Sequence, residues 1–489
     1  MKKVNKQFVL YILSLINFAV IFVGSSMYLF VSNKVSEINL EEMLFHMKAP
    51  IKGTGGNLIE GYLRSNMVSL LLIAFALIGL IFIFFHTKIR YHVRTCLCIF
   101  LVSIFIMLFG GVRLFILIDA PQYIKNQMTA SKFIEENYIK PEKTNITFPK
   151  HKRNLIWIYM ESMESSYASR EKGGKLNENL IPELTELAEN NINFSESDIM
   201  GGATSSYGTG WTTASLFAQT SGLPMLLNIG DGTYEYKKFA PGAYTFGDIL
   251  KSEKYVQKFM MGSDAVFGGR KSYLENHGSY EIYDYNLAKK KGDIPKNYYE
   301  WWGIEDEKLY KFAKRELQEI SQKDQPFALS LLTVDTHFVG GYVCSQCHKK
   351  HKDRYLDVIH CASRQVSNFV KWIQKQKFYK NTTIVITGDH PTMDGEFVSK
   401  YYDDPQRRKV YNCIINAPIQ TDHDKKREFN TFDFYPTVLS AMGVYIEGDR
   451  LGLGTNLFSG KKTLAEQYGY EKIDTEFSKT SKFYNNYIW

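Results

Sequence analysis

The sequence predicts an α/β protein whose N-terminal part consists of apolar helices. Two observations carry this prediction. The long uninterrupted apolar runs lie in the first 120 residues, and from about residue 154 short apolar runs alternate with stretches of helical spacing. Such alternation is typical of a buried, mostly parallel sheet with helices on both faces. A chain of 489 residues is also long enough for more than one domain.

Three N-terminal apolar runs are long enough to cross a bilayer, which takes roughly 20 residues. They span residues 8–31, 67–85 and 96–118, and Arg113 lies near enough to one end of the third to reach the interface. The first run is too long for a cleaved signal peptide and lacks a small-residue cleavage site. We therefore expect residues 1–120 to form a membrane anchor with three transmembrane helices.

Basic residues in the short flanking segments predict the orientation of the anchor. They precede the first run or separate the second from the third, and they are Lys2, Lys3, Lys6, Lys88, Arg90 and Arg94. Short basic segments stay in the cytoplasm, so we expect a multi-pass protein of the cell membrane with everything after about residue 120 outside the cytoplasm. Residues 121–153 are expected to form a linker whose lysines rest on anionic lipid head groups.

The hydrophobic content and the net charge of the chain do not point to a particular partner. The hydrophobic content of 45% is ordinary for a folded protein, and part of the net charge of +8 belongs to the anchor and the linker. The outward placement and the lack of any reader motif argue against a nucleic-acid partner.

The α/β part is predicted to begin at residue 154. The predicted strands cover residues 154–160, 255–262, 326–334 and 382–387. The predicted helices cover residues 179–191, 307–322, 364–376 and 433–443, the last of which ends in a glycine.

Polar side chains follow three of these strands. Glu161 follows the first strand, Asp335, Thr336 and His337 follow the third, and Asp389 and His390 follow the fourth. In open α/β sheets, ligands bind at the carboxyl ends of the strands. Any one of these residues is equally well explained as a helix cap. Three strand ends with oxygen and nitrogen donors favour a site for a divalent metal such as Mn²⁺ or Zn²⁺. Glu164 is interpreted as a solvated helix carboxylate.

A hydroxyl nucleophile is expected in the Gly-, Ser- and Thr-rich segment 201–224, which becomes helix-compatible near residue 213. A hydroxyl at the start of that helix would lie where backbone amides face an anion. Thr212 is the first candidate, with Thr213 and Ser215 as alternatives. A plain N-cap role for Thr212 explains the same pattern.

Two of the six cysteines lie in an N-terminal apolar run, and four lie in the predicted α/β part. Cys96 and Cys98 lie in an apolar run and are expected to pack there, whereas Cys344, Cys347, Cys361 and Cys413 are expected outside the cytoplasm. The segment VCSQCHKKH, with further histidines nearby, looks like half of a zinc site. Disulfides are the commoner fate outside the cytoplasm, so we expect disulfides or free thiols rather than structural zinc.

Trp301 and Trp302 are candidates for a sugar-stacking surface, with packing as the alternative for at least one of them.

Six motifs occur in one order along the chain: NLIWIYMES, GTGWTTASLFAQTSGLP, TVDTHF, VITGDH, DFYPTVLSAMG and RLGLGTNLF. In these motifs the chain resembles the sulfatase-like membrane phosphoglycerol transferases of the alkaline phosphatase superfamily. That group includes lipoteichoic acid synthase and the periplasmic transferase that modifies glucans. The likeness covers roughly residues 150–460. It implies an extracytoplasmic catalytic domain at 154–460 and a C-terminal extension at 461–489.

The resemblance also implies roles for individual residues. It assigns a metal site to Glu161, Thr212, Asp389 and His390, with Thr212 as both ligand and nucleophile, and substrate contacts to His337 and Arg270. It implies one divalent metal, Mn²⁺ in the first place, with Zn²⁺ or Mg²⁺ as alternatives. Trp211 stands where the synthase branch has a lysine. Position 212 is not a cysteine, which argues against formylglycine-dependent sulfate hydrolysis.

The resemblance implies a metal-dependent transferase at the membrane. It would move glycerol phosphate from phosphatidylglycerol, through a covalent Thr212 intermediate, to an extracytoplasmic glycan or polymer. One alternative is a phosphoethanolamine transferase of the same superfamily. Another is a catalytically inactive membrane sensor or scaffold, against which the intact set of candidate ligands argues.

Overall fold

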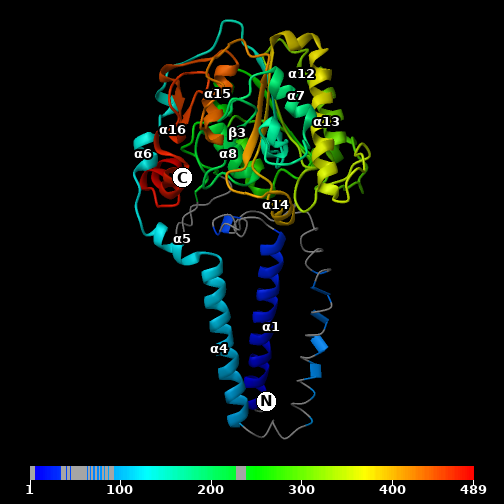
Figure 1. The fold of residues 1–489 in the computed structure, drawn as a ribbon, viewed down its shortest axis with the longest axis vertical. Helices are drawn as coiled ribbons and strands as arrows, with labels where there is room; N and C mark the ends of the chain where they lie inside the picture. The colour runs from blue at the N-terminus through cyan, green and yellow to red at the C-terminus, as the bar shows by residue number, and fades with distance from the viewer. Residues whose placement is uncertain are drawn as a thin grey trace. The chain divides into compact units, whose positions relative to one another are not determined.

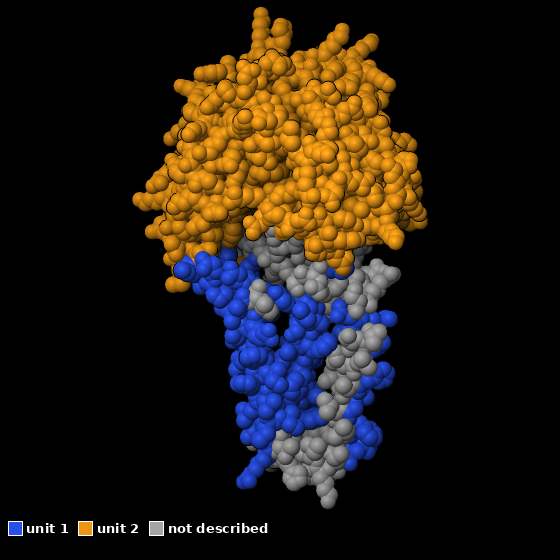
Figure 2. Space-filling view, viewed as in Figure 1, with its two compact units in different colours: residues 1–40, 55–125 blue, residues 41–54, 126–489 orange. Residues whose placement is uncertain are grey.

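The computed structural model describes residues 6–34, 93–226 and 238–489, with single positions at 40, 44 and 45 and between 63 and 86. The chain divides into two compact units (Figure 2). The helical unit comprises residues 1–40 and 55–125, and the sheet unit comprises residues 41–54 and 126–489.

The helical unit contains two long apolar helices, α1 (Lys6–Lys34) and α4 (Val93–Leu117). Each includes a segment long and apolar enough to cross a membrane, Val9–Ser26 in α1 and Leu97–Ile116 in α4. The two helices pack side by side, and the Asn17 side chain donates a hydrogen bond of 3.1 Å to Ser103 Oγ. Most of the run expected at residues 67–85 lies outside the described residues.

The sheet unit is built on a seven-stranded sheet with the order β3-β8-β7-β2-β6-β4-β5. Its strands are β2 (Asn154–Met160), β3 (Gly202–Thr204), β4 (Val256–Met261), β5 (Glu281–Tyr283), β6 (Phe327–Leu332), β7 (Thr382–Gly388) and β8 (Lys409–Ile415). Strands β2, β4, β5, β6 and β7 are parallel to one another, whereas β8 is antiparallel to both β7 and β3. The predicted α/β class with a mostly parallel sheet is confirmed, and the antiparallel strand near one edge makes the sheet mixed.

Helices cover both faces of this sheet because its central strand is apolar on both sides. In β2, Leu155, Trp157 and Tyr159 enter one hydrophobic core, and the alternate residues Ile156 and Ile158 enter the other. The first core includes side chains of α8 (Thr212–Ser221), α9 (Phe246–Ser252) and α15 (Phe434–Ala441). The second includes side chains of α7 (Pro182–Asn190), α12 (Asp306–Ile320) and α13 (Arg354–Gln374), which lie together in Figure 1.

The remaining elements are short. They are α5 (Ala120–Gln127), α6 (Phe133–Asn137), α10 (Arg270–Asn276), α11 (Tyr285–Lys291), α14 (Gly395–Tyr401), α16 (Leu464–Tyr468), α17 (Tyr470–Phe477), β1 (Ile146–Thr147), β9 (Tyr445–Ile446), β10 (Arg450–Leu451) and β11 (Gly454–Thr455). Strand β1 pairs with β9, and α16 and α17 bury Leu464, Ile473 and Phe477 in the first core. Segments that precede β2 and follow β8 in the chain therefore either pair with each other or contribute side chains to the first core.

The register of the sheet brings three strand ends to one edge. Strand β2 lies between β6 and β7, with Tyr159 opposite both Leu332 and Thr387. Met160 lies opposite Gly388, where an added Cβ would come 2.0 Å from the carbonyl oxygen of Met163. Only glycine fits there, so the turn after β2 packs directly against the end of β7.

Candidate active site

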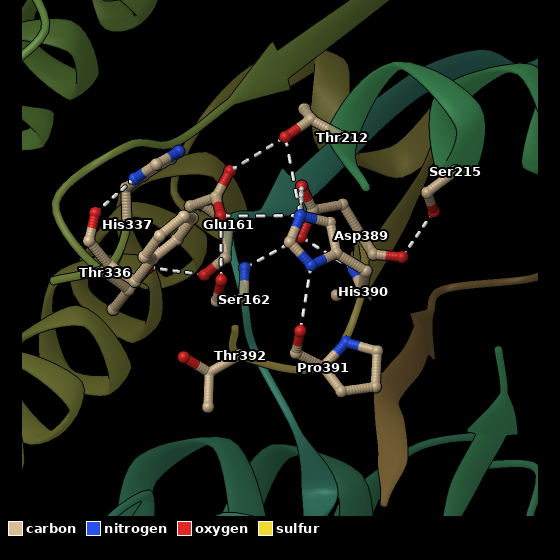
Figure 3. Close-up of polar contacts among 12 residues, drawn as sticks. Glu161, Ser162, Thr212, Ser215, Thr336, His337, Asp389, His390, Pro391 and Thr392 are labelled. Carbon is tan, nitrogen blue, oxygen red and sulfur yellow. Dashed lines mark hydrogen bonds and ion pairs between the residues drawn. The ribbon is translucent and has the colours of Figure 1, made fainter. Parts of the chain in front are cut away.

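Thr212 is the first residue of α8, and its side chain points toward the ends of β2 and β7 (Figure 3). Its hydroxyl oxygen lies 3.3 Å from Glu161 Oε2 and 3.4 Å from His390 Nε2. Trp211 occupies the N-cap position, and no side-chain hydrogen bond caps this helix. The hydroxyl of Thr212 therefore faces the strand ends instead of capping its own helix, and it remains half-buried.

Glu161 is held by hydrogen bonds from the end of β6. Its backbone N–H donates to Thr333 Oγ1 at 2.9 Å, and its carbonyl oxygen accepts from the hydroxyl of Thr336. Its Oε1 atom accepts from Ser162 Oγ at 2.7 Å. Ser162 has a φ of 50°, a left-handed conformation that turns the chain away from the sheet directly after the carboxylate.

Asp389 is held in place by hydrogen bonds to one of its carboxylate oxygens, whereas the other oxygen is available to a ligand. Its Oδ1 atom accepts the backbone N–H groups of Ser162 and His390, both at 2.7 Å, and its carbonyl oxygen accepts from Ser215 Oγ. Among the described residues, its buried Oδ2 atom accepts no hydrogen bond. It lies 3.4 Å from His390 Nε2. A buried carboxylate oxygen that accepts no hydrogen bond is suited to bind a cation.

His390 presents one defined ring nitrogen to this cluster. Its Nδ1 atom donates to the carbonyl oxygen of Pro391 at 2.9 Å, which assigns the proton of the neutral ring to that nitrogen. The lone pair of Nε2 then faces Glu161 Oε1, 3.6 Å away. A backbone partner on the far nitrogen is the usual support for a metal-binding histidine.

The donor set fits a divalent cation. One ligand atom each from Glu161, Asp389 and His390 lies within 4.8 Å of the other two, and all three residues are buried. Burial raises the pKa of Asp389 to about 8, and the charge of Glu161 adds to this effect. Burial opposes ionisation of Glu161 as well, but His337, His390 and the side-chain hydrogen bonds with Ser162 and Asp389 together lower the pKa of Glu161. A dication would neutralise both carboxylates at once.

His337 lies beside this cluster on the loop after β6. Its Nδ1 atom donates to the carbonyl oxygen of Phe338 at 2.6 Å, and its ring centroid lies 4.5 Å from that of Trp302. Burial lowers the pKa of His337, so the ring is biased toward its neutral form, although the charge of Glu161 opposes this shift.

Arg270, the first residue of α10, is buried beside the same acidic groups. Its guanidinium donates to the carbonyl oxygens of Phe267 and Asp264, both at 3.0 Å. Burial lowers the pKa of Arg270 to about 10, and Glu161 is the foremost charge that opposes this shift. At neutral pH the side chain remains a cation, held by backbone carbonyls within the electrostatic reach of Glu161.

The alternative nucleophiles point elsewhere. Ser215 donates its hydroxyl to the backbone of Asp389 and so positions that residue. Thr213 Oγ1 lies 2.7 Å from where a Cβ on Gly268 would stand, so it faces the loop that precedes Arg270. The sequence argument names Thr336 among the polar residues after a strand, but it misses the supporting hydroxyls of Ser162 and Thr333, although each stands within two residues of a strand end.

The prediction for Glu164 is wrong. This side chain is fully buried and forms an ion pair of 2.7 Å with Arg408. It also accepts hydrogen bonds from the backbone N–H of Thr392 at 2.8 Å and from Tyr402 Oη at 3.2 Å. The chain folds inward after Ser162 instead of forming a solvated helix, so Glu164 anchors the segment that follows His390.

The tryptophan pair and the cysteines have structural partners. Trp302 is buried between His337 and Phe267, and Trp301 donates from Nε1 to the carbonyl oxygen of Val334 at 3.1 Å. Both tryptophans therefore pack or hydrogen-bond within the protein. No disulfide joins the four cysteines of the sheet unit, all of which the structure describes.

The sulfatase family model matches residues 153–444, which include every candidate site residue. The chain belongs to the sulfatase family. This sulfatase-family chain is 30% identical over 333 residues to phosphoglycerol transferase I of Escherichia coli K12, a match that covers 66% of the chain and 41% of that relative. The match to phosphoglycerol transferase I of Shigella flexneri has the same identity and coverage. The chain thus spans less than half the length of these relatives.

Two solved structures share the fold of this sulfatase-family chain. One is a protein of the alkaline phosphatase superfamily from Vibrio parahaemolyticus, with a TM-score of 0.51 and 20% identity over 67% of this chain and 76% of that one. The other is the lipoteichoic acid synthase LtaP from Listeria monocytogenes, with a TM-score of 0.50 and 17% identity over 67% of this chain and 80% of that one. The expected resemblance is confirmed for the family and the fold.

Proposed function

We propose that this chain is a membrane-anchored phosphotransferase that uses Thr212 as its nucleophile. It moves glycerol phosphate from phosphatidylglycerol to a hydroxyl of a glycan or polymer outside the cytoplasm. The observation that carries this proposal is the position of the Thr212 hydroxyl, 3.3 Å from Glu161 Oε2 and 3.4 Å from His390 Nε2, at the start of a helix. The phosphoglycerol transferases among its relatives support the choice of the transferred group.

Glu161, Asp389, His390 and Thr212 would hold one divalent cation, for which Mn²⁺ is our first choice and Zn²⁺ or Mg²⁺ the alternatives. When bound, such an ion favours the alkoxide of a coordinated hydroxyl and neutralises charge on phosphoryl oxygens. The buried Oδ2 atom of Asp389 and the lone pair of His390 Nε2 are the protein atoms that fit this role.

The first half-reaction uses groups that the fold places around Thr212. Its oxygen attacks phosphorus, the new Oγ–P bond forms, and the bond from phosphorus to the diacylglycerol oxygen breaks. Diacylglycerol leaves as the alcohol, with the proton that the Thr212 hydroxyl gives up, and glycerophosphate remains on Thr212 as a diester. The backbone N–H groups at the start of α8 and the Arg270 guanidinium stabilise the phosphoryl oxygens.

The second half-reaction reverses the first with another alcohol. An acceptor hydroxyl attacks the diester: its oxygen forms the new bond to phosphorus, the bond from phosphorus to Thr212 Oγ breaks, and the proton lost by the acceptor hydroxyl passes to the Thr212 oxygen. His337, close to Glu161 and biased toward its neutral form, is the group we assign to contact the substrate in both steps.

The apolar helices suit a lipid donor. We place α1, the apolar run predicted at residues 67–85 and α4 across the membrane, with the sheet unit on the extracytoplasmic side, as the flanking basic residues predict. The donor head group and the leaving diacylglycerol then both stay at the membrane surface, where the reaction proceeds.

Donor specificity tests the proposal. Full-length protein in mixed micelles is supplied with Mn²⁺ and fluorescent phosphatidylglycerol, and the release of diacylglycerol is measured. Phosphatidylethanolamine is offered in a parallel reaction. Release from phosphatidylglycerol that disappears in Thr212→Ala is the expected result. Preferential release from phosphatidylethanolamine would establish the phosphoethanolamine transferase instead, and no release from either lipid would favour the inactive scaffold.

A further inference from the structure

Three cysteines gather where the loop between β6 and α13 packs against α13, apart from the candidate active site. Cys344 and Cys347 belong to the loop, and Cys361 lies within α13. The sulfur of Cys344 lies 3.6 Å from that of Cys347 and 3.7 Å from that of Cys361. All three sulfurs lie within 4.8 Å of one another.

These separations match the edges of a metal–thiolate tetrahedron. Zinc–sulfur bonds of about 2.3 Å in tetrahedral geometry place neighbouring sulfurs about 3.8 Å apart. A disulfide would need a sulfur–sulfur distance of about 2.05 Å. We propose that Cys344, Cys347 and Cys361 bind a Zn²⁺ ion, which reverses the expectation drawn from the compartment alone. Water or the exposed neighbour His348 completes the tetrahedron.

The surroundings of the sulfurs support thiolates. Gln365 donates from Nε2 toward the sulfurs of both Cys344 and Cys361 at 3.5 Å. Arg364 donates from Nη2 to the sulfur of Cys361, also at 3.5 Å, and to the carbonyl oxygen of Gln346. Donors of this kind stabilise coordinated thiolates and orient them on a metal. Zinc binding would release the thiol protons to solvent.

The proposed ion would fasten the loop that carries His337. Two contacts already tie this loop to α13 and to the segment after His390. Tyr355 of α13 donates to the carbonyl oxygen of Thr336 at 2.8 Å, and the N–H of Gly340 donates to Asp394 at 2.7 Å. The zinc would add a cross-link from the far end of the same loop to α13. Its role is thus structural and separate from the cation at Glu161.

The test counts zinc in full-length protein purified in detergent under reducing conditions. The background is Glu161→Gln/Asp389→Asn, which weakens the other metal site. After loading with zinc and dialysis against metal-free buffer, we expect about one zinc per chain by elemental analysis. Cys347→Ser should lower this content at least tenfold, whereas Cys347→His, which keeps a zinc ligand, should retain most of it. Cys413→Ser is the matched control and should retain all of it.

A spectroscopic arm needs no cysteine variant. Cobalt replaces zinc in the same background, and an intense thiolate-to-cobalt charge-transfer band is expected in the near ultraviolet. Absence of this band, or equal zinc in the Cys347→Ser variant and its parent, would overturn the proposal. So would protection of two of these thiols from alkylation in denatured protein that was purified without reductant, since that result establishes a disulfide.

Discussion

The hydroxyl oxygen of Thr212 lies 3.3 Å from Glu161 Oε2, although 51 positions separate the two residues in the chain. One residue begins helix α8 and the other follows strand β2, and the fold brings both ends to the edge where β7 also stops. A nucleophile candidate thus meets its carboxylate only through long-range packing.

Removing the Thr212 hydroxyl should abolish diacylglycerol release. We expect Thr212→Ala to lower the rate at least about 10³-fold, because no oxygen remains to attack phosphorus. Thr212→Ser keeps the oxygen and should retain activity within about tenfold of wild type, since only a methyl group is lost. Thr213→Ala is the matched control and should behave like wild type. Equal rates for Thr212→Ala and wild type would refute the assignment.

Asp389→Asn should have opposite effects on apo stability and on metal binding. Burial disfavours the charged carboxylate, so without metal the variant should have the higher melting temperature. Adding Mn²⁺ at about 100 times its Kd should stabilise wild type by about 2.7 kcal/mol and leave the variant nearly unchanged. Thermal unfolding with and without Mn²⁺ measures both effects, and an equal metal-induced shift in the variant would contradict the ligand role of Asp389.

Chelation should remove activity reversibly. Treatment with EDTA is expected to abolish diacylglycerol release, because the hydroxyl of Thr212 is a weak nucleophile without a metal. Mn²⁺ should restore the rate, whereas His390→Asn should raise the metal concentration needed by at least about tenfold. Titration of the rate against free Mn²⁺ checks both, and full activity in EDTA would exclude a metal-dependent reaction.

The buried pair of Glu164 and Arg408 should matter for stability. Removing the carboxylate alone in Glu164→Ala should cost about 3–5 kcal/mol, since an unpaired buried guanidinium remains. The double variant Glu164→Gln/Arg408→Met should recover much of that loss. The exposed pair of Lys172 and Glu189 is the control, and Glu189→Ala should cost less than about 1 kcal/mol. Denaturant unfolding measures all three variants, and a cost below 1 kcal/mol for Glu164→Ala would refute this account.

Gly268 should tolerate no side chain. Its φ is +63°, and an added Cβ would stand 2.7 Å from Thr213 Oγ1. Gly268→Ala should cost about 1–3 kcal/mol and also slow the reaction, because the displaced loop carries Arg270. Gly448 is the control that separates backbone strain from steric contact, because its φ is +74° but an added Cβ there would meet no atom within 4 Å. Gly448→Ala should cost about 1 kcal/mol with no change in rate, and equal rates for the two variants would show that the loop position is unimportant.

Glu161 and Glu164 show how far sequence reasoning extends. Both follow the same apolar strand, so the local pattern treats them alike. Their partners come from elsewhere: Thr212 and His390 face Glu161, whereas Arg408 pairs with Glu164. The strand ends and the family motifs therefore selected Glu161, but nothing local separates a ligand candidate from a structural ion pair.

The sequence by itself determined the alternation of strands and helices, the apolar N-terminal helices, and the segments that carry Glu161, Thr212, Asp389 and His390. These features follow from local periodicity and from short motifs, which a chain carries whatever its packing. Only the tertiary structure decided which side chains meet. The tautomer of His390, the unsatisfied oxygen of Asp389 and the clustering of Cys344 with Cys361 depend on hydrogen bonds and packing between distant segments. Burial of these side chains changes their pKa values and decides which partners they can contact, and no local sequence pattern predicts burial of this kind.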